Sequence, residues 1–149
     1  MYLLHSAILL VIFLYSLLAI AVGYENLYRK KNPFGLTPYF TLLGVFVWAD
    51  SIVFGVFFAL SSLTCLVLAN FTLFLLVYSV FWVIRSVGEQ IYWFLEQFAQ
   101  DHRNLPASLK MSKFYKGESI YIHYQILWQC VSVIAIISSV YCFYQLLST

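Results

Sequence analysis

The chain has 149 residues, of which 63% are hydrophobic and 20% aromatic, while only 9% are charged. A soluble domain carries about a quarter charged residues, so this composition excludes an ordinary water-soluble domain and indicates a polytopic integral membrane protein. The net charge of +2 is too small to indicate nucleic-acid binding, and we expect no nucleic-acid partner.

Four apolar runs have about the 20 residues that a helix needs to cross the hydrocarbon core. The first, about residues 3–22, has no basic segment before it and is longer than the apolar part of a signal peptide, so we expect it to be retained. The second begins after Thr37-Pro38, a typical N-cap followed by proline, and the Ser61-Ser62 turn separates it from the third. The sequence predicts one all-α membrane domain over residues 1–149, a four-helix bundle with spans at about 3–22, 38–60, 63–84 and 121–147.

The connection between the third and fourth spans is too long for a bare loop. Apolar side chains recur at helical spacing in it, at Val87, Ile91 and Phe98. We therefore expect an amphipathic cytoplasmic helical segment. The third helix either continues toward residue 100 or turns at Gly88 onto the membrane surface, and Pro106 ends it. A basic piece, SLKMSKFYKG, is expected to form a short helix before the fourth span.

All Lys and Arg residues fall in two of the connecting segments. Under the positive-inside rule both segments are cytoplasmic, which places the N- and C-termini outside, in what we expect to be the cell (inner) membrane. The eight residues are Arg29, Lys30 and Lys31 after the first span, and Arg85, Arg103, Lys110, Lys113 and Lys116 after the third.

Asp50 is the one acid expected in the bilayer interior, near the middle of the second span. An acid at that depth costs about 2.5–3.5 kcal/mol to insert and should face the bundle or a polar cavity. It either handles a proton or cation, or holds two helices together. Asn70 is the expected hydrogen-bond partner on the third span, and Gln125 and Gln129 add a polar line to the fourth span.

Polar residues at the inner boundary form a second candidate site, for lipid headgroups or for a polar substrate portion. They are Lys30, Lys31, Arg85, Glu89, His102 and His123. No catalytic spacing links them, and His5 and His123 fall near opposite faces of the membrane, so they cannot clamp a haem together. We expect no catalytic residue, metal or cofactor. Cys65 and Cys142 both fall toward the outer ends of their spans, where they either pair or remain free thiols.

Small residues spaced by four, at Ser51, Gly55 and Ala59, let another backbone approach the second span closely. Packing within the chain, against the first or third span, is favoured over a dimer seam.

These observations favour a non-enzymatic subunit of a homo-oligomeric or larger membrane complex, with membrane lipids and other membrane subunits as partners. One alternative is an oligomeric proton- or cation-coupled transporter or channel that uses Asp50. A second is a lipid-active membrane enzyme with its site at the inner boundary.

Overall fold

The computed structural model describes residues 2–115 and 117–148, and the regular structure in this part of the chain is helical. Its four long helices are each long and apolar enough to cross a membrane. The prediction of an all-helical chain with four helices of this length and hydropathy is therefore confirmed. The helices are α1 (Tyr2–Tyr24), α2 (Trp48–Val67), α3 (Phe71–Gln97) and α4 (Ser119–Leu147).

The chain divides into two compact units. The N-terminal unit extends to Val77 and includes the last residues of α4 from Gln145, and the C-terminal unit is Tyr78–Tyr144. The N-terminal unit is thus built on α1 and α2, and the C-terminal unit on most of α3 and α4. A single membrane domain remains a prediction.

Small residues line the contact between α1 and α2, which run antiparallel. A Cβ atom on Gly55 would lie 2.6 Å from Cγ1 of Ile20 and 3.1 Å from the carbonyl oxygen of Ser16. One turn away, a Cβ on Gly23 would overlap the Ser51 side chain. Two helices that lack side chains at these points can approach closely and gain dispersion contacts along their length.

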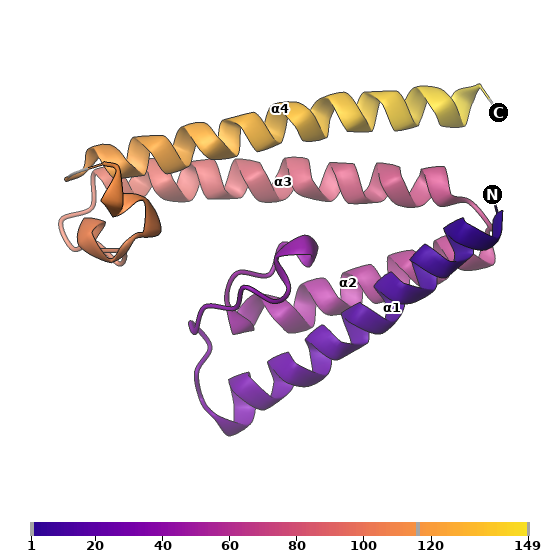
Figure 1. Cartoon of the computed structure of the whole chain (residues 1–149), viewed down its shortest axis with the longest axis horizontal. Helices are drawn as coiled ribbons and strands as arrows, with labels where there is room; N and C mark the ends of the chain where they lie inside the picture. The colour runs from indigo at the N-terminus through magenta and orange to yellow at the C-terminus, as the bar shows by residue number, and fades with distance from the viewer. Residues whose placement is uncertain (1, 116, 149) are drawn as a thin grey trace. The chain divides into compact units, whose positions relative to one another are not determined.

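The second helix begins at Trp48, not at Pro38 as predicted. Residues 33–47 instead form a hairpin, in which Leu36 and Val47 pair as an antiparallel bridge. Its tip contains the single 3₁₀ turn Thr41–Leu43 and Gly44, whose φ of 69° lies in the left-handed region that favours glycine. We call this segment the 33–47 hairpin. Figure 1 shows it folded back beside the first part of α2.

The turn between α2 and α3 lies at Leu68 and Ala69, not at Ser61-Ser62 as predicted. Ser62 is buried within α2, and its hydroxyl donates to the carbonyl of Phe58 at 2.6 Å. A serine that bonds the preceding turn in this way is tolerated inside a helix. Ala69 has a positive φ of 50°, which ends the helix.

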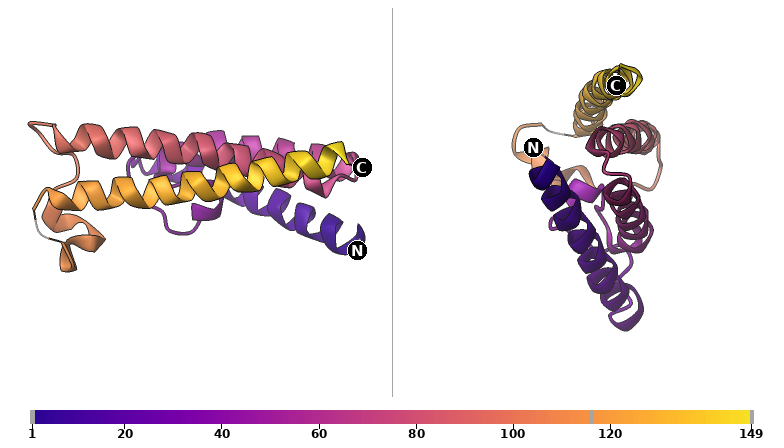
Figure 2. Two further views of the ribbon diagram at one scale, coloured as in Figure 1. Left: turned by 90° about the horizontal axis from the view of Figure 1, so that it is seen from above. Right: turned by 90° about the vertical axis from the view of Figure 1, so that its right-hand side faces the viewer.

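α3 runs without interruption from Phe71 to Gln97, so the helix does not turn at Gly88. It ends well before Pro106, which begins the 3₁₀ turn Pro106–Ser108. The basic piece that follows contains a second 3₁₀ turn, Lys110–Lys113, and no α-helix among its described residues. α3 and α4 then run side by side in opposite directions (Figures 1 and 2).

Aromatic side chains form the core where α3 ends and α4 begins. Trp93, Ile120 and Tyr121 are buried there, with Tyr124 and Trp128 packed against them. The indole of Trp93 stacks on the ring of Tyr124 with centroids 4.4 Å apart. This aromatic core fixes the ends of the two helices and positions the polar groups around them.

Candidate functional site

A buried polar contact joins α3 to α4 near the middle of both helices. The hydroxyls of Ser86 and Ser132 lie 2.7 Å apart, and the Gln90 amide donates to the Ser132 hydroxyl and to the carbonyl of Trp128 at 3.3 Å. Ser86 and Ser132 are both buried. Each side chain therefore has a partner inside the unit, which is the arrangement that buried polar groups require.

Arg85 and Glu89, two predicted inner-boundary residues, form an ion pair on α3. The Arg85 guanidinium lies 3.1 Å from Glu89 Oε1, one helical turn away, and the two side chains are 20% and 16% exposed. Arg85 stands fourteen residues into α3 and not in a connecting loop. Its charge is therefore matched on the same helix, which lowers the cost of placing either group in an apolar span.

The two glutamines of the predicted polar line have different environments. Gln125 accepts a hydrogen bond from the Gln97 amide at 2.9 Å and is half-buried between the helices. Gln129 is exposed on α4, and it makes no side-chain hydrogen bond within residues 2–115 and 117–148. The two glutamines lie one helical turn apart, and only Gln125 has a hydrogen-bond partner on α3.

A polar clamp that the sequence did not predict closes the loop after α3. Glu96 is only 5% exposed, and its Oε1 accepts the backbone N–H of Asn104 at 2.8 Å. The Asn104 side chain donates to the Tyr92 hydroxyl, and the Tyr121 hydroxyl donates to the Asn104 carbonyl at 2.6 Å. The helical spacing of Val87, Ile91 and Phe98 predicts that Glu96, on the opposite side of that helix, faces water. A signal was present, since an acid near a helix end can accept a backbone N–H of the following loop.

His102 and His123 have different neighbours. The His102 ring lies against Tyr121, with centroids 5.2 Å apart, and its Nδ1 is buried without a hydrogen-bond partner among the described residues. The His123 ring stacks on Tyr115 at 3.5 Å, and its Nδ1 lies 2.8 Å from the carbonyl oxygen of Ser119. The residues that the structure describes contain no group of three His, Cys, Asp or Glu side chains that could hold a metal ion.

Lys30 and Lys31, the other inner-boundary residues, follow the π-helical turn Glu25–Arg29 that extends α1. Lys30 Nζ lies 3.7 Å from Glu25 Oε1, and both side chains are more than half exposed. Lys31 has a positive φ of 51°. An exposed pair of this kind contributes little to stability, so these lysines form a basic surface beside the 33–47 hairpin.

Asp50 lies in the first turn of α2, and Asn70 lies beyond the other end of that helix. Asp50 Oδ2 accepts the backbone N–H of Phe46 at 3.5 Å, whereas Asn70 Oδ1 accepts the N–H of Leu73 at 2.9 Å and caps α3. Twenty residues at 1.5 Å each separate the two by about 30 Å. The predicted mid-helix position of Asp50 and its bond to Asn70 are therefore wrong.

The predicted small-residue stripe lies on the α1 side of α2. Ser51 and Ala59 are 0% and 7% exposed, and Gly55 faces Ile20 and the Ser16 backbone of α1. The Ser51 hydroxyl donates to the carbonyl of Trp48 at 2.5 Å. The thiols of Cys65, Cys130 and Cys142 are free.

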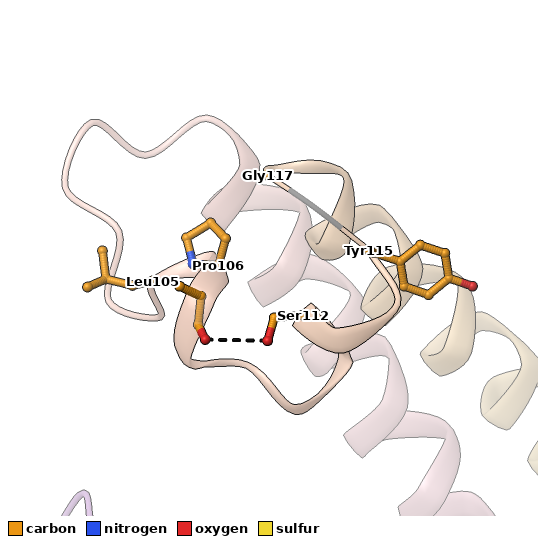
Figure 3. A pocket seen from close by; sticks show the side chains of 6 residues that line it. Leu105, Pro106, Ser112, Tyr115 and Gly117 are labelled. Carbon is orange, nitrogen blue, oxygen red and sulfur yellow. Dashed lines mark hydrogen bonds between the residues drawn. The ribbon is translucent and has the colours of Figure 1, made fainter.

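An open pocket of about 560 Å³ lies in the loop between α3 and α4 (Figure 3). The Ser112 hydroxyl donates across it to the carbonyl of Ala107 at 3.4 Å. The lining is mostly apolar and carries no acid or histidine that could act on a substrate. It consists of Leu105, Pro106, Ala107, Ser112, Tyr115 and Gly117.

No family, curated protein or solved structure matches this chain.

Proposed function

We propose that the chain is a small multi-pass integral membrane protein that acts without catalysis, as a self-associating subunit of a homo-oligomeric or larger membrane complex. The observation that carries this proposal is Gln129, an amide exposed on a long apolar helix. Membrane lipids and further copies of the chain are its partners, and we infer that both basic segments face the cytoplasm, with the termini on the outside of the cell membrane.

Gln129 stands about 15 Å from the first residue of α4. An amide facing lipid leaves two donors and an acceptor without partners, and polar side chains in spans accordingly face another helix. The same residue of a second copy offers the matching donors and acceptor. A two-fold axis along α4 brings the two amides together, because such an interface presents the same surface from both copies.

The neighbours of Gln129 extend this face into a continuous seam. Their spacing alternates between four and three residues, which is the repeat that lets two helices interdigitate. A single polar residue in such a seam fixes the register and the number of helices. The residues of the α4 seam are Ile122, Ile126, Gln129, Val133, Ile136 and Val140, and the aliphatic ones are 46–65% exposed.

The other polar groups support a structural role, because they hold the chain to itself. Glu96 binds the Asn104 backbone, Gln97 binds Gln125, and the Asp50 carboxylate accepts a backbone N–H at the start of α2. Asp50 in that position stabilises the helix start, where the helix dipole favours negative charge. The position of Asp50 supports anchoring over ion transport.

Cross-linking along the seam tests the proposal. In a chain with Cys65→Ala, Cys130→Ser and Cys142→Ala, we expect Val133→Cys to form disulfide-linked dimers in lipid bilayers under mild oxidation. Ile134→Cys is the matched control: it is 65% exposed but points about 140° away from Gln129 around the helix. Equal cross-linking at both positions, or monomers at every protein-to-lipid ratio, would contradict the proposal.

The amide itself is tested by substitution. Gln129→Leu should weaken association about threefold to tenfold, which matches the 0.6–1.4 kcal/mol typical of a hydrogen bond between membrane helices. Energy transfer between labelled copies in liposomes measures the association constant. Gln125→Leu, which removes an amide already bonded within the chain, should leave association unchanged. Proton or cation flux that Asp50→Asn abolishes would instead support transport.

A further inference from the structure

We propose that the 33–47 hairpin is a re-entrant segment, which enters the hydrocarbon layer from the side of Arg29 and exposes its outer face to lipid acyl chains. The inference rests on the membrane insertion proposed above and goes beyond it. It assigns a lipid-facing surface to a segment that is not a helix. Three observations in the N-terminal unit support it: the pairing of its backbone, the depth of its inner face, and the chemistry of its outer face.

The hairpin pairs its own backbone groups and those at the start of α2. The backbone N–H of Thr37 donates to the carbonyl oxygen of Phe46 at 2.9 Å. The backbone N–H of Gly44 donates to the carbonyl oxygen of Thr41, also at 2.9 Å. The first N–H groups of α2 are taken up as well: those of Trp48 and Ala49 donate to the carbonyls of Gly35 and Pro33 at 3.2 and 3.0 Å. Non-helical backbone is tolerated at membrane depth only when its polar groups are satisfied without bulk water.

The inner face of the hairpin reaches far along α1. Phe40, Leu43 and Val45 are at most 3% exposed, and the Phe40 ring lies 5.3 Å from the ring of Tyr15. The Tyr15 hydroxyl also donates to the carbonyl of Tyr39. Tyr15 precedes Arg29 by fourteen residues, or about 20 Å of helix. In the proposed arrangement the basic residues mark the membrane surface. The tip of the hairpin therefore lies well toward the membrane interior from them.

The outer face of the hairpin is apolar and open. A loop of this length on a water-soluble surface is normally polar, and an apolar patch of this kind marks an interaction surface. Lys30 and Lys31, at its base, have the charge that phosphate headgroups attract. A lipid layer matches both surfaces: its acyl chains would contact the apolar outer face, and its phosphate headgroups would contact the lysines at the base. The face consists of Phe34, Leu36, Tyr39 and Leu42, which are 66–80% exposed.

The depth of the hairpin can be measured with nitroxide labels in lipid bilayers. In the cysteine-free chain, Leu42→Cys carries the test label, Val53→Cys is the control on an exposed face of α2, and Lys30→Cys is the control at the base. Oxygen collects in the hydrocarbon, whereas a charged nickel chelate stays in water. We expect the Leu42 label to resemble the Val53 label, with nickel accessibility about tenfold below that at Lys30.

Each other result has a defined meaning. Nickel access at Leu42 equal to that at Lys30, with Val53 protected, overturns the hairpin proposal alone. Protection of Leu42 from both oxygen and nickel means that a protein partner covers this face, which also overturns it. Nickel access at Val53 overturns the membrane insertion on which the proposal rests, and the hairpin proposal falls with it.

A second measurement avoids substitutions altogether. A lipid-soluble diazirine, photolysed with the unaltered chain in bilayers, should attach to Leu36 or Leu42 as readily as to Val53, as read by mass spectrometry of the peptides. Labelling of Val53 without labelling of the hairpin would overturn the proposal even if the cysteine-free chain fails to fold.

Discussion

Gly23 of α1 and Ser51 of α2 are in such close contact that a Cβ atom on Gly23 would occupy the space of the Ser51 side chain. Ser51 is itself fully buried. The contact makes glycine obligatory at this point for steric reasons alone, since Gly23 lies within a regular helix and not in a left-handed turn.

Gly23→Ala should therefore destabilise the N-terminal unit by about 1–3 kcal/mol, the usual cost of overpacking a well-packed contact. Thermal unfolding in a mild detergent measures it as a lower Tm. Gly88→Ala is the matched control, because a Cβ there would meet no atom within 4 Å. That variant should gain about 0.5–1 kcal/mol from the better helix propensity of alanine. Equal effects of the two changes would contradict the close contact.

Ser132→Ala should cost about 1–3 kcal/mol, because it removes the oxygen that accepts from Gln90 and contacts Ser86. Gln90→Leu in the same chain should recover part of the loss, since no donor is then left without its partner. A double-mutant cycle measured by unfolding in detergent should give a coupling energy of about 0.5–3 kcal/mol. Additive losses would show that the two side chains act independently.

Glu96→Ala should open the loop between α3 and α4 to proteolysis. The backbone N–H held by Glu96 belongs to Asn104, so the carboxylate protects the peptide bond after Arg103, a trypsin site. Removing this acceptor should cost about 1–3 kcal/mol of local stability. The measurement is the rate of cleavage after Arg103. Glu96→Gln keeps an acceptor and should cleave slowly, and Glu118→Ala, at an exposed position, should have little effect.

Thr37→Val should leave stability unchanged or raise it. The Thr37 side chain is 2% exposed, and its hydroxyl is buried without a hydrogen-bond partner among the described residues. Valine has a similar shape and removes the unsatisfied group, which typically costs about 1–3 kcal/mol to bury. Thermal unfolding checks this, with Thr41→Val at the exposed tip as the control. A marked loss of stability would mean that the hydroxyl has a partner.

Asp50→Leu should lower the stability of the start of α2 more than Asp50→Asn. Asparagine keeps an oxygen that can accept the Phe46 N–H, whereas leucine removes it. The loss of such an acceptor at a helix start costs about 0.5–2 kcal/mol. Hydrogen exchange of the Phe46 amide reports it directly. Faster exchange in both variants alike would show that the charge, and not the acceptor, is what matters.

The sequence predicted the number and type of the long helices because an apolar run of about twenty residues is typical of a helix long enough to cross a membrane. The predicted start at Pro38 was wrong, because residues 38–47 are as apolar as a helix and periodicity alone does not distinguish a short apolar helix from an apolar hairpin. Gly35 and Gly44 were the available signals. Serine occurs both in turns and inside helices, so Ser61-Ser62 did not distinguish the two. In the structure the Ser62 hydroxyl donates to the Phe58 carbonyl inside α2.

The candidate polar groups were found one by one, but most of their partners were not. Arg85 and Glu89 are four residues apart, a spacing that indicates a pair on one helix. The pairing of Gln125 with Gln97 depends instead on how α3 and α4 are rotated and on the rotamers. Glu96 was assigned to the polar side of an amphipathic pattern because periodicity does not register a loop that folds back over that side. The Asn104 backbone, eight residues later, is what buries it.

The 33–47 hairpin also sets an order of events during synthesis. Its inner wall is Tyr15 of α1 and its carbonyls are bound by Trp48 and Ala49 of α2. If the segment is re-entrant as we propose, the Gly35 and Pro33 carbonyls gain these two donors only once the start of α2 has been synthesised. The proposal therefore implies that the hairpin settles into lipid together with the start of α2 and not as soon as it is made.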